Sequence, residues 1–578
     1  MLLFSDVAVF FKEIEKRSGR LEMTDLLANL FKQTNEKEID KLIYILQGIL
    51  APPYEGIELG MGERFALEAI SSASGYAKSE VEKNYKKSGD LGDSAEELLD
   101  KKKQTALSTT DMEISYLFDA LIKIAKSSGS GSQDLKIKIL TELLNNSSGL
   151  ESRYIIRYVT GSLRLGVGDP TILDALSVAH AGDKSLREKL ERAYNTCSDL
   201  GHVAKIFYQD PKKIEKFVVT PFKPLMPALA ERENSPGAII ERLGKCGIEM
   251  KYDGLRLQCH KKDDNVEIYS RKLEKMTRMF PDIVEAILKL KAKEIIFEGE
   301  ALAFDNEKNK FFPFQQTMHR RRKHGIDAAS KEFPMNVFVF DVLYIDGRDM
   351  TEKSYLERRE IIEELFVSNV LRPSQMKLVS KTNELEKIFQ KSISQGLEGI
   401  IAKDLGAPYT AGKRKFAWIK LKKSYGKAVD TIDAVIVGYY LGQGTRAEFE
   451  FGGVLVAVYN SDRGKLETVA RIGSGFSEEE MKNFSEMLGE IKTKKPPATL
   501  DYSVEKPDFW VEPKFVVEVA FDDITKSSMH TCGAKGGTDE KGFALRFPRL
   551  VKLREDKTIK EITITEEVIR MYELQAGK

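Results

Sequence analysis

The sequence has few cysteines and no long apolar run. Its 578 residues include only 4 Cys, and none of these lies in a Cys-x-x-Cys pair. This scatter excludes a disulfide framework and a zinc ribbon, and it favours a reducing compartment. No apolar run reaches the roughly 18 residues of a membrane span, and the start Met1-Leu2-Leu3-Phe4 has no basic segment before Asp6. We therefore expect an intracellular protein with no membrane association.

An excess of charge of either sign is also absent. Lys plus Arg number 90 and Asp plus Glu number 89, so the formal net charge is +1. Bulk charge thus gives no argument for a nucleic-acid partner, which local basic patches would have to hold. The composition is 42% hydrophobic and 31% charged, as in globular proteins. The length indicates about three to five domains, which excludes a single small binding module.

The N-terminal region, to about residue 205, has helical periodicity. Apolar residues from Ile39 to Leu50 recur at three- and four-residue steps, and Ala51-Pro52-Pro53 follows. Two polar stretches, 78–110 and 127–132, interrupt this pattern. Charge runs are usually solvated, so both stretches are predicted to be linkers.

The rest of the chain predicts strands. From about 215 to 425, short strands alternate with helices such as 355–365; the strands expected are 248–251, 255–259, 266–269, 295–298, 337–343, 399–403 and 418–422. From about 430, Val-rich runs at 433–440, 454–459, 466–472 and 511–521 surround one helix, 478–488. This pattern is typical of a small β-barrel such as an OB-fold. The predicted fold is multidomain: an all-α N-terminal domain, an α/β domain and a C-terminal β-barrel.

The segment Glu249-Met250-Lys251-Tyr252-Asp253-Gly254-Leu255-Arg256 carries the clearest chemical signal. Alternation along a strand puts Glu249 and Lys251 on one face, and Asp253-Gly254 predicts a turn into the next strand. A lysine is a nucleophile only when its amine is neutral. A strand–turn–strand segment with a surface lysine would explain this octapeptide if it stood alone.

Later segments make that simple explanation insufficient. Phe297-Glu298-Gly299-Glu300 places two carboxylates on one strand face, a repulsion usually met by a cation or metal. Phe340 ends an apolar run with a ring that could stack on a base. Glu398 precedes a strand that ends in Lys403, and Trp418 to Lys422 puts two lysines on one strand face, about 7 Å apart from the strand rise.

In this order, the segments closely resemble the motifs of the covalent nucleotidyltransferases, and specifically of ATP-dependent DNA ligases of the archaeal and eukaryotic replicative type. Lys251 to Arg256 is similar to the family's K-x-D-G-x-R motif. Arg546-Phe547-Pro548-Arg549 and Arg554-Glu555-Asp556-Lys557 resemble its R-F-P-R and R-x-D-K elements, and 157–168 resembles its helical DNA-binding domain. The resemblance covers nearly the whole chain.

The resemblance implies a helical DNA-binding domain at 1–210, an adenylation domain at 211–427 and an OB-fold domain at 428–578. Lys251 would carry AMP, and AMP would then pass to the 5′-phosphate of a DNA nick before the 3′-hydroxyl displaces it. ATP and Mg²⁺, or another divalent cation, are the implied cofactors, with Glu300 and Glu398 as metal ligands. The implied nucleotide contacts are Glu249, Arg256, Arg271, Glu300, Phe340, Arg414, Lys420, Lys422, Arg554 and Lys557.

Two other functions stay open at this point. An RNA ligase or capping-type nucleotidyltransferase would share the lysine motif, but it would not be expected to carry the long helical N-terminal region. A non-catalytic nucleic-acid-binding protein built on the barrel would use Lys251 only structurally. The choice among ATP, ADP and GTP also stays open.

The resemblance further implies nicked double-stranded DNA as the partner, a monomer, and a cytoplasmic, nucleoid-associated location in an archaeal-type cell. Gln104-Thr105-Ala106-Leu107 keeps the Gln and the aliphatic residue of a sliding-clamp peptide but lacks its paired aromatics. We interpret this segment as linker rather than as a clamp-binding motif.

Overall fold

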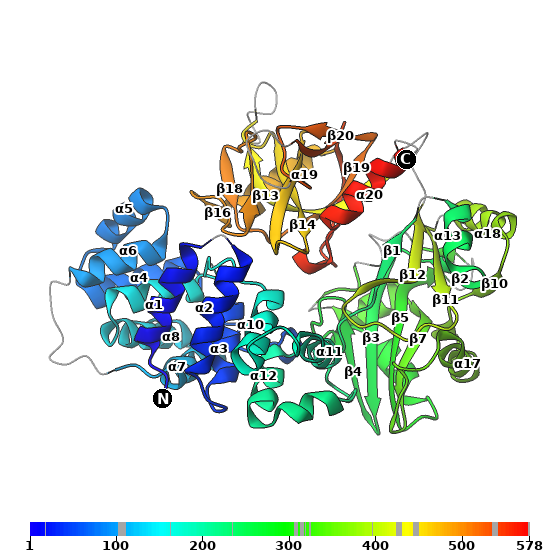
Figure 1. The fold of residues 1–578 in the computed structure, drawn as a ribbon, viewed down its shortest axis with the longest axis horizontal. Helices are drawn as coiled ribbons and strands as arrows, with labels where there is room; N and C mark the ends of the chain where they lie inside the picture. The colour runs from blue at the N-terminus through cyan, green and yellow to red at the C-terminus, as the bar shows by residue number, and fades with distance from the viewer. Residues whose placement is uncertain are drawn as a thin grey trace.

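The protein is described from a computed structural model that covers residues 1–578, apart from 18, 102–110, 162, 234, 306–309, 313–316, 318, 323–324, 396, 423–429, 443–449, 535–540 and 576–578. The chain forms a helical part, a part that mixes strands and helices, and a strand-rich part. Figure 1 shows the helical part in blue to cyan, the mixed part in green and the strand-rich part above and between them.

The helical part is built from amphipathic helices around one large core. Its α3 (Ile39–Gln47) buries Ile39, Leu42 and Leu46, and it ends where Gly48 takes a left-handed φ of 69°. The other helices are α1 (Phe4–Glu15), α2 (Arg20–Lys32), α4 (Glu63–Ser74), α5 (Lys78–Ser88), α6 (Leu91–Asp100), α7 (Ile114–Lys126), α8 (Ser132–Asn145), α9 (Gly149–Val159), α10 (Asp169–Ala181), α11 (Arg187–Cys197) and α12 (Leu200–Gln209).

The prediction of a linker over 78–110 was wrong for its described part. The helices α5 and α6 occupy 78–100, and residues 102–110 lie outside the described residues. Asp90 begins α6 by accepting a hydrogen bond from the Asp93 N–H at 3.0 Å. Leu98 and Leu99 are buried, so the charged residues of this stretch cover one face of packed helices. At 127–132 the expected loop joins α7 to α8, which begins at Ser132.

Two sheets form the mixed part. One has the order β1 (Leu229–Arg232), β12 (Arg414–Lys422), β11 (Gly399–Asp404), β2 (Cys246–Lys251), β10 (Met376–Val379). The other runs β4 (Asn265–Ser270), β3 (Leu255–Lys262), β5 (Glu294–Asp305), β7 (Met335–Ile345), β8 (Arg348–Asp349), with β6 (Lys310–Phe311) on β5 and β9 (Leu371–Pro373) on β7. Helices α13 (Pro236–Leu243), α14 (Pro281–Leu288), α16 (Ile326–Glu332), α17 (Tyr355–Leu365) and α18 (Thr382–Ser394) accompany them.

Asp253-Gly254 makes the predicted turn into the next strand, but the two strands that it joins do not pair with each other. The strand before it, β2, pairs with β10 and β11, whereas the strand after it, β3, pairs with β4 and β5 in the other sheet. A Cβ on Gly254 would lie 2.6 Å from the carbonyl oxygen of Ala301. The glycine thus lets the chain pass closely from one sheet to the other.

The strand-rich part confirms the predicted C-terminal β domain. Its main sheet runs β16 (Lys492–Thr493), β18 (Phe509–Val511), β13 (Asp430–Tyr440), β14 (Gly453–Asn460), β15 (Lys465–Ile472), β17 (Leu500–Asp501), with β19 (Val516–Phe521) on β13 and β22 (Arg549–Leu553) on β19. A ribbon of β20 (Asp523–Ser527) and β21 (Gly542–Arg546), and helices α19 (Glu478–Gly489) and α20 (Thr565–Gln575), complete it. The single strand expected over 511–521 is two strands, because Pro513 lies between them and lacks a backbone donor.

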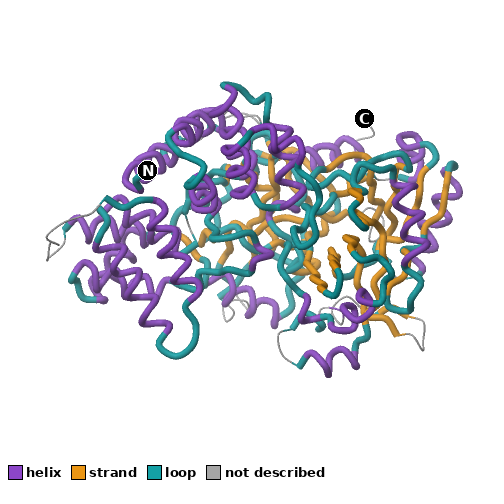
Figure 2. The backbone as a smooth tube through the Cα atoms, turned by 90° about the horizontal axis from the view of Figure 1, so that it is seen from below, coloured by secondary structure: helices purple, strands orange, loops and turns teal. Residues whose placement is uncertain are grey.

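The strand-rich part contacts both other parts. Arg164 Nε lies 3.4 Å from Glu512, and Lys560 pairs with Asp169 of the helical part. Arg20 of α2 also donates to the Ser461 and Asp462 carbonyls of the strand-rich part at 3.3 and 3.2 Å. On its other side, Lys552 Nζ lies 3.1 Å from Asp253. In Figure 2, helices gather around the N-terminus, whereas most strands lie in the middle and on the opposite side of the molecule. Among the described residues, no helix is long and apolar enough to cross a membrane.

Candidate active site

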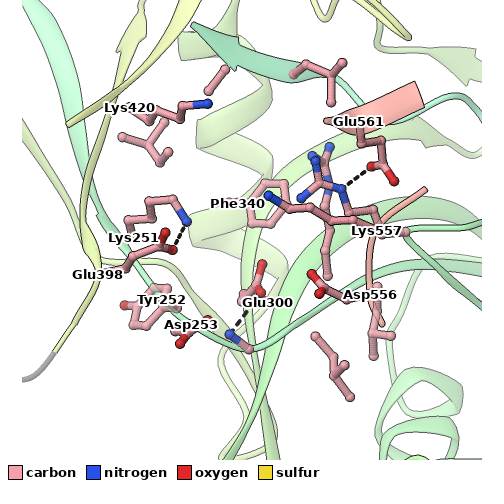
Figure 3. A pocket seen from close by; sticks show the side chains of 18 of the residues that line it. Lys251, Tyr252, Asp253, Glu300, Phe340, Glu398, Lys420, Asp556, Lys557 and Glu561 are labelled. Atoms are coloured by element: carbon pink, nitrogen blue, oxygen red, sulfur yellow. Dashed lines mark hydrogen bonds and ion pairs between the residues drawn. The ribbon is translucent and has the colours of Figure 1, made fainter. Parts of the chain in front are cut away.

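A cavity of about 170 Å³ lies where the mixed part meets the strand-rich part. Both sheets of the mixed part line it, and the strand-rich part covers it. Figure 3 shows Lys251 and Glu398 across the cavity from Asp556, Lys557 and Glu561. Predicted site residues that line it are Glu249, Lys251, Arg256, Arg271, Glu300, Phe340, Glu398, Lys420, Lys422, Arg554 and Lys557.

Lys251 stands at the end of β2, and strand pairing places it beside two other predicted residues. The register sets Gly399 of β11 opposite both Lys251 and Lys422. Gly399 has a φ of 152°, and a Cβ there would lie 2.0 Å from the Leu421 carbonyl oxygen, so only glycine fits. This close approach brings Glu398, immediately before it, against both lysines.

Glu398 is the shared partner of these two lysines. It pairs with Lys251 through Oε2, and its Oε1 lies 2.5 Å from Lys422 Nζ. Burial alone would raise the pKa of Glu398, but Lys251 and Lys422 outweigh burial and hold the pKa well below its usual value. The anion is therefore firmly fixed beside the lysine amine.

Glu300 has the opposite character. Burial raises its pKa to about 7, even though Lys251 and Arg256 act to lower it. The N–H of Gly254 donates to Glu300 Oε1 at 3.2 Å. The neighbouring carboxylate, Glu298, does not line the cavity, and it accepts from Arg256 at 2.8 Å and from Tyr409 at 2.8 Å. The positive charge of Arg256 thus compensates the negative charge of Glu298.

Arg256 and Phe340 form one wall. Arg256 Nη1 donates to the Ala228 carbonyl at 2.7 Å, and its guanidinium lies 5.4 Å from the Phe340 ring centroid. Among the described residues, Arg256 Nε is a buried donor without a hydrogen-bond partner. A buried donor in a cavity wall is normally satisfied, so this atom is available to a bound molecule.

The far wall comes from the strand-rich part. Arg554 lies 3.3 Å from Asp433 and pairs with Asp556 at 2.8 Å, and Lys557 also pairs with Asp433. Burial is the main cause that lowers the pKa of Lys557, to about 7, although Asp433 acts to raise it. Across the gap, Arg271 pairs with Glu561. Carboxylates thus hold both cations of this wall.

Two predicted features cannot be placed. The side chain of Arg414 on β12 lies outside the described residues, as does the segment 104–107 considered for clamp binding. Lys420 lines the cavity and lies 3.4 Å from Glu567 of α20. Within the described part of the chain, no group of three or more His, Cys, Asp or Glu side chains is arranged to hold a metal ion by itself.

Several lining residues were missed from the sequence. Lys403 and Trp418 had been noted only as parts of strands, yet Lys403 Nζ lies 4.4 Å from the Trp418 ring centroid and 3.2 Å from Glu249. Asp433 carried no signal beyond the start of a Val-rich strand. The Lys403 position could have been found, because a lysine that ends a buried strand needs an anionic partner.

A lysine-bearing cavity between two domains, with a helical domain attached, defines the architecture of a multidomain nucleotidyltransferase. Three family models match: DNA ligase N terminus at 3–177, ATP dependent DNA ligase domain at 227–422, and ATP dependent DNA ligase C terminal region at 447–557. The chain belongs to the ATP-dependent DNA ligase family, whose members seal nicks through an adenylate. This confirms the predicted ligase activity and sets aside the RNA-directed and non-catalytic alternatives.

Individual relatives are similar over their full length. A protein described as "Probable DNA ligase" from Dictyoglomus turgidum is 45% identical over 582 residues, which is 99% of this chain and 97% of the relative. A DNA ligase from Sulfolobus acidocaldarius is 40% identical over 593 residues, covering 100% and 98%. Among solved structures, mycobacterial DNA ligase D complexed with ATP and MES is 25% identical with a TM-score of 0.36, over 58% of this chain and 97% of that chain.

Proposed function

We propose that Lys251 is the residue that carries AMP in this ligase. The observation that supports the assignment is its place in the cavity: Nζ pairs with the half-buried Glu398, and the cations of a second domain stand across the cavity. In the first step the Nζ lone pair attacks the α-phosphorus of ATP, and pyrophosphate leaves with the electrons of the broken bond. Nζ must lose its proton before it attacks, so it must leave the ion pair with Glu398.

Two further displacements follow from the same geometry. An oxygen of the DNA 5′-phosphate attacks the phosphorus of the lysine adduct, and the P–N bond breaks to return the amine. The 3′-hydroxyl then attacks the adenylated 5′-phosphate, loses its proton and expels AMP. Each step is a phosphoryl-type transfer that depends on alignment and on cations near the developing charge.

The other cavity residues receive roles by position. Phe340 stacks on the base and Glu249 reads its edge, while the unpaired Arg256 Nε and Arg271 contact sugar or phosphate. Lys420, Lys422 and Arg414 contact phosphates from β12. Arg554 and Lys557 exchange their carboxylate partners for the pyrophosphate of ATP.

A divalent cation such as Mg²⁺ fits Glu300 and Glu398. Mg²⁺ is commonly held by one or two carboxylates together with substrate phosphates, and the half-buried Glu300 lines the cavity and accepts from the Gly254 N–H. When bound, the ion would neutralise charge on the phosphates. Burial raises the pKa of Glu300 to about 7. Binding of the cation to this carboxylate would therefore displace a proton from it.

The three parts would divide the work. We assign duplex binding to 1–210, adenylation to 211–427 and closure over the cavity to 428–578. The enzyme would act on nicked double-stranded DNA, as a monomer, at the nucleoid.

Intact-mass analysis after incubation with ATP and Mg²⁺ tests the assignment. Wild type is expected to gain the mass of AMP, and Lys251→Ala to gain none while keeping its thermal midpoint. Lys262→Ala is the matched control, because this exposed lysine on β3 pairs with Glu294 outside the cavity. An AMP adduct on Lys251→Ala would show that another residue is the nucleophile.

A further inference from the structure

The carboxylate of Glu249 is held from behind by the helix α17. The Tyr355 hydroxyl donates to Oε1, and Arg359 Nη1 lies 3.4 Å from the same oxygen. Lys403 Nζ lies 3.2 Å from Oε2. All four residues are buried, at 3% exposure or less. The carboxylate therefore has a fixed position in the cavity wall.

Arg359 is itself fixed, so it cannot easily release Glu249. Its Nη1 donates to Ser374 Oγ at 2.9 Å, Nη2 donates to the Ser374 carbonyl at 2.5 Å, and Nε donates to Glu363 at 2.8 Å. Tyr355 is equally constrained, because it opens α17 directly after Ser354, whose side chain caps the helix by accepting from the Glu357 N–H.

These contacts leave Glu249 with little capacity to accept more hydrogen bonds. A carboxylate offers about four acceptor sites, and donors from Tyr355, Arg359 and Lys403 take up three. One site remains toward the cavity. The amino group of adenine brings a single donor to such a site, whereas guanine presents adjacent N1–H and N2–H donors that pair best with two free carboxylate oxygens.

We infer that Tyr355 and Arg359 are positioning residues that favour adenine over guanine nucleotides by leaving Glu249 one free acceptor site. The inference rests on the proposed adenylation of Lys251 and adds the cause of base choice. It assigns to α17, which does not supply the nucleophile, control over which nucleotide the nucleophile meets.

The test compares lysine adduct formation with ATP and with GTP, as kcat/KM for each nucleotide. Tyr355→Phe removes one donor and keeps the ring, so it frees part of Oε1. The GTP-to-ATP ratio of kcat/KM is expected to rise about tenfold, which corresponds to about 1.4 kcal/mol, mainly through a lower KM for GTP. Tyr344→Phe is the matched control, because its hydroxyl donates to Glu294 away from the cavity at 2.8 Å; its ratio should equal that of wild type.

A second variant guards against a folding failure. Arg359→Gln, checked by its thermal midpoint, should shift the ratio in the same direction, and Arg359→Lys should shift it less because the charge remains. Equal losses with ATP and GTP in both Tyr355→Phe and Arg359→Gln would overturn the inference and leave these residues purely structural. Absence of any adduct on wild type, with either nucleotide, would instead refute the proposed function.

Discussion

His260 on β3 is a fully buried imidazole with both nitrogens engaged. Its Nδ1 accepts from the Phe222 N–H at 2.9 Å, and its Nε2 donates to Gln258 Oε1 at 3.0 Å. Gln258 Oε1 also accepts from the Leu225 N–H at 2.8 Å. The neutral ring thus ties the segment that enters the mixed part to its second sheet. Burial lowers the pKa of His260 to about 3.

This lowered pKa predicts acid sensitivity. Below pH about 6.5 the unfolded chain binds a proton on His260 that the folded chain does not. The stability contributed by the neutral ring is therefore complete above pH 6.5 and is lost as pH falls, at up to about 1.4 kcal/mol per pH unit. Thermal midpoints at pH 7 and pH 5 should fall more for wild type than for His260→Gln. Parallel falls in both proteins would argue against this source of acid sensitivity.

At the scale of elements, Arg157 joins three helices of the N-terminal part. From α9 it lies 3.0 Å from Asp90 and 2.9 Å from Asp93, at the start of α6, and it pairs with Glu15 of α1. Arg157 and Asp90 side chains are only 4% and 3% exposed. Burial alone would raise the pKa of Asp90, but Arg157 and Arg164 hold it below its usual value.

Removing this arginine should loosen the helical part. Arg157→Met removes the cation that Asp90, Asp93 and Glu15 share and leaves the buried Asp90 with Arg164 as its remaining arginine. Breaking a buried pair in this way costs up to about 3–5 kcal/mol. The expected result is a lower thermal midpoint and weaker binding to nicked DNA, with lysine adduct formation unchanged. Lys101→Met is the control, because its exposed pair with Glu97 within one helix should contribute less than about 0.5 kcal/mol. A loss of adduct formation in Arg157→Met would show that the substitution also disturbs the cavity around Lys251.

Some strands and helices could be predicted from the sequence and others could not, depending on whether their signal is local. The strands β2, β11 and β12 were predictable because alternation and strand length are local, and their motifs place Lys251, Glu398 and Lys422 near one another. The helices α5 and α6 were not, because their long charged runs hide the few apolar residues they bury, such as Leu98. The turn at Asp253-Gly254 was predictable, but the passage from one sheet to the other was not, because the sheet that a strand joins depends on partners far along the chain.

The residues of the candidate site likewise fall into those that local motifs predict and those that they do not. Residues within motifs, such as Glu300 and Arg554, were predicted to belong to it, and they line the cavity. Tyr355 and Arg359 were not, since 106 and 110 positions separate them from Glu249 and no local periodicity reports the contact. Their part in the site depends on how α17 packs against the sheet.

At the scale of the whole molecule, Arg554 and Lys557 reach the cavity only because the strand-rich part has closed over it. Cations of a second domain help most where pyrophosphate leaves, in the first step. Replacing both with alanine should depress adduct formation by about two orders of magnitude or more, given the effect of losing groups that stabilise developing charge. Sealing of a pre-adenylated nick should suffer much less.

Both assays are needed to interpret that double variant. Arg471→Gln provides a control in the same part, because Arg471 pairs with Glu505 away from the cavity. Equal losses in adduct formation and in sealing of the pre-adenylated nick would assign Arg554 and Lys557 to the stability of the strand-rich part or to DNA binding.

The ion pair between Arg164 and Glu512 connects the helical part to the strand-rich part. Arg164 belongs to the 157–168 segment proposed to bind DNA, and it also lies 3.0 Å from Asp90. Glu512 of the strand-rich part thus takes the place beside Arg164 that a DNA phosphate would take. Glu512→Gln should raise the affinity for nicked DNA several-fold, consistent with about 1 kcal/mol for a partly buried pair, without changing adduct formation. An unchanged affinity in a binding titration would show that this pair does not compete with DNA.

Dissolved salt weakens both the contacts between the protein and DNA phosphates and the ion pairs within the protein. Each phosphate gripped by the protein releases condensed counterions, so affinity falls with salt by a slope of about 0.9 per phosphate. Salt also screens the internal pairs at Arg164 and Lys560, which must open before the helical part can grip a duplex. The two effects oppose each other, so the logarithmic salt slope would be shallower than the number of phosphates contacted. The ionic strength that the ligase tolerates is then set partly by carboxylates on its own surface.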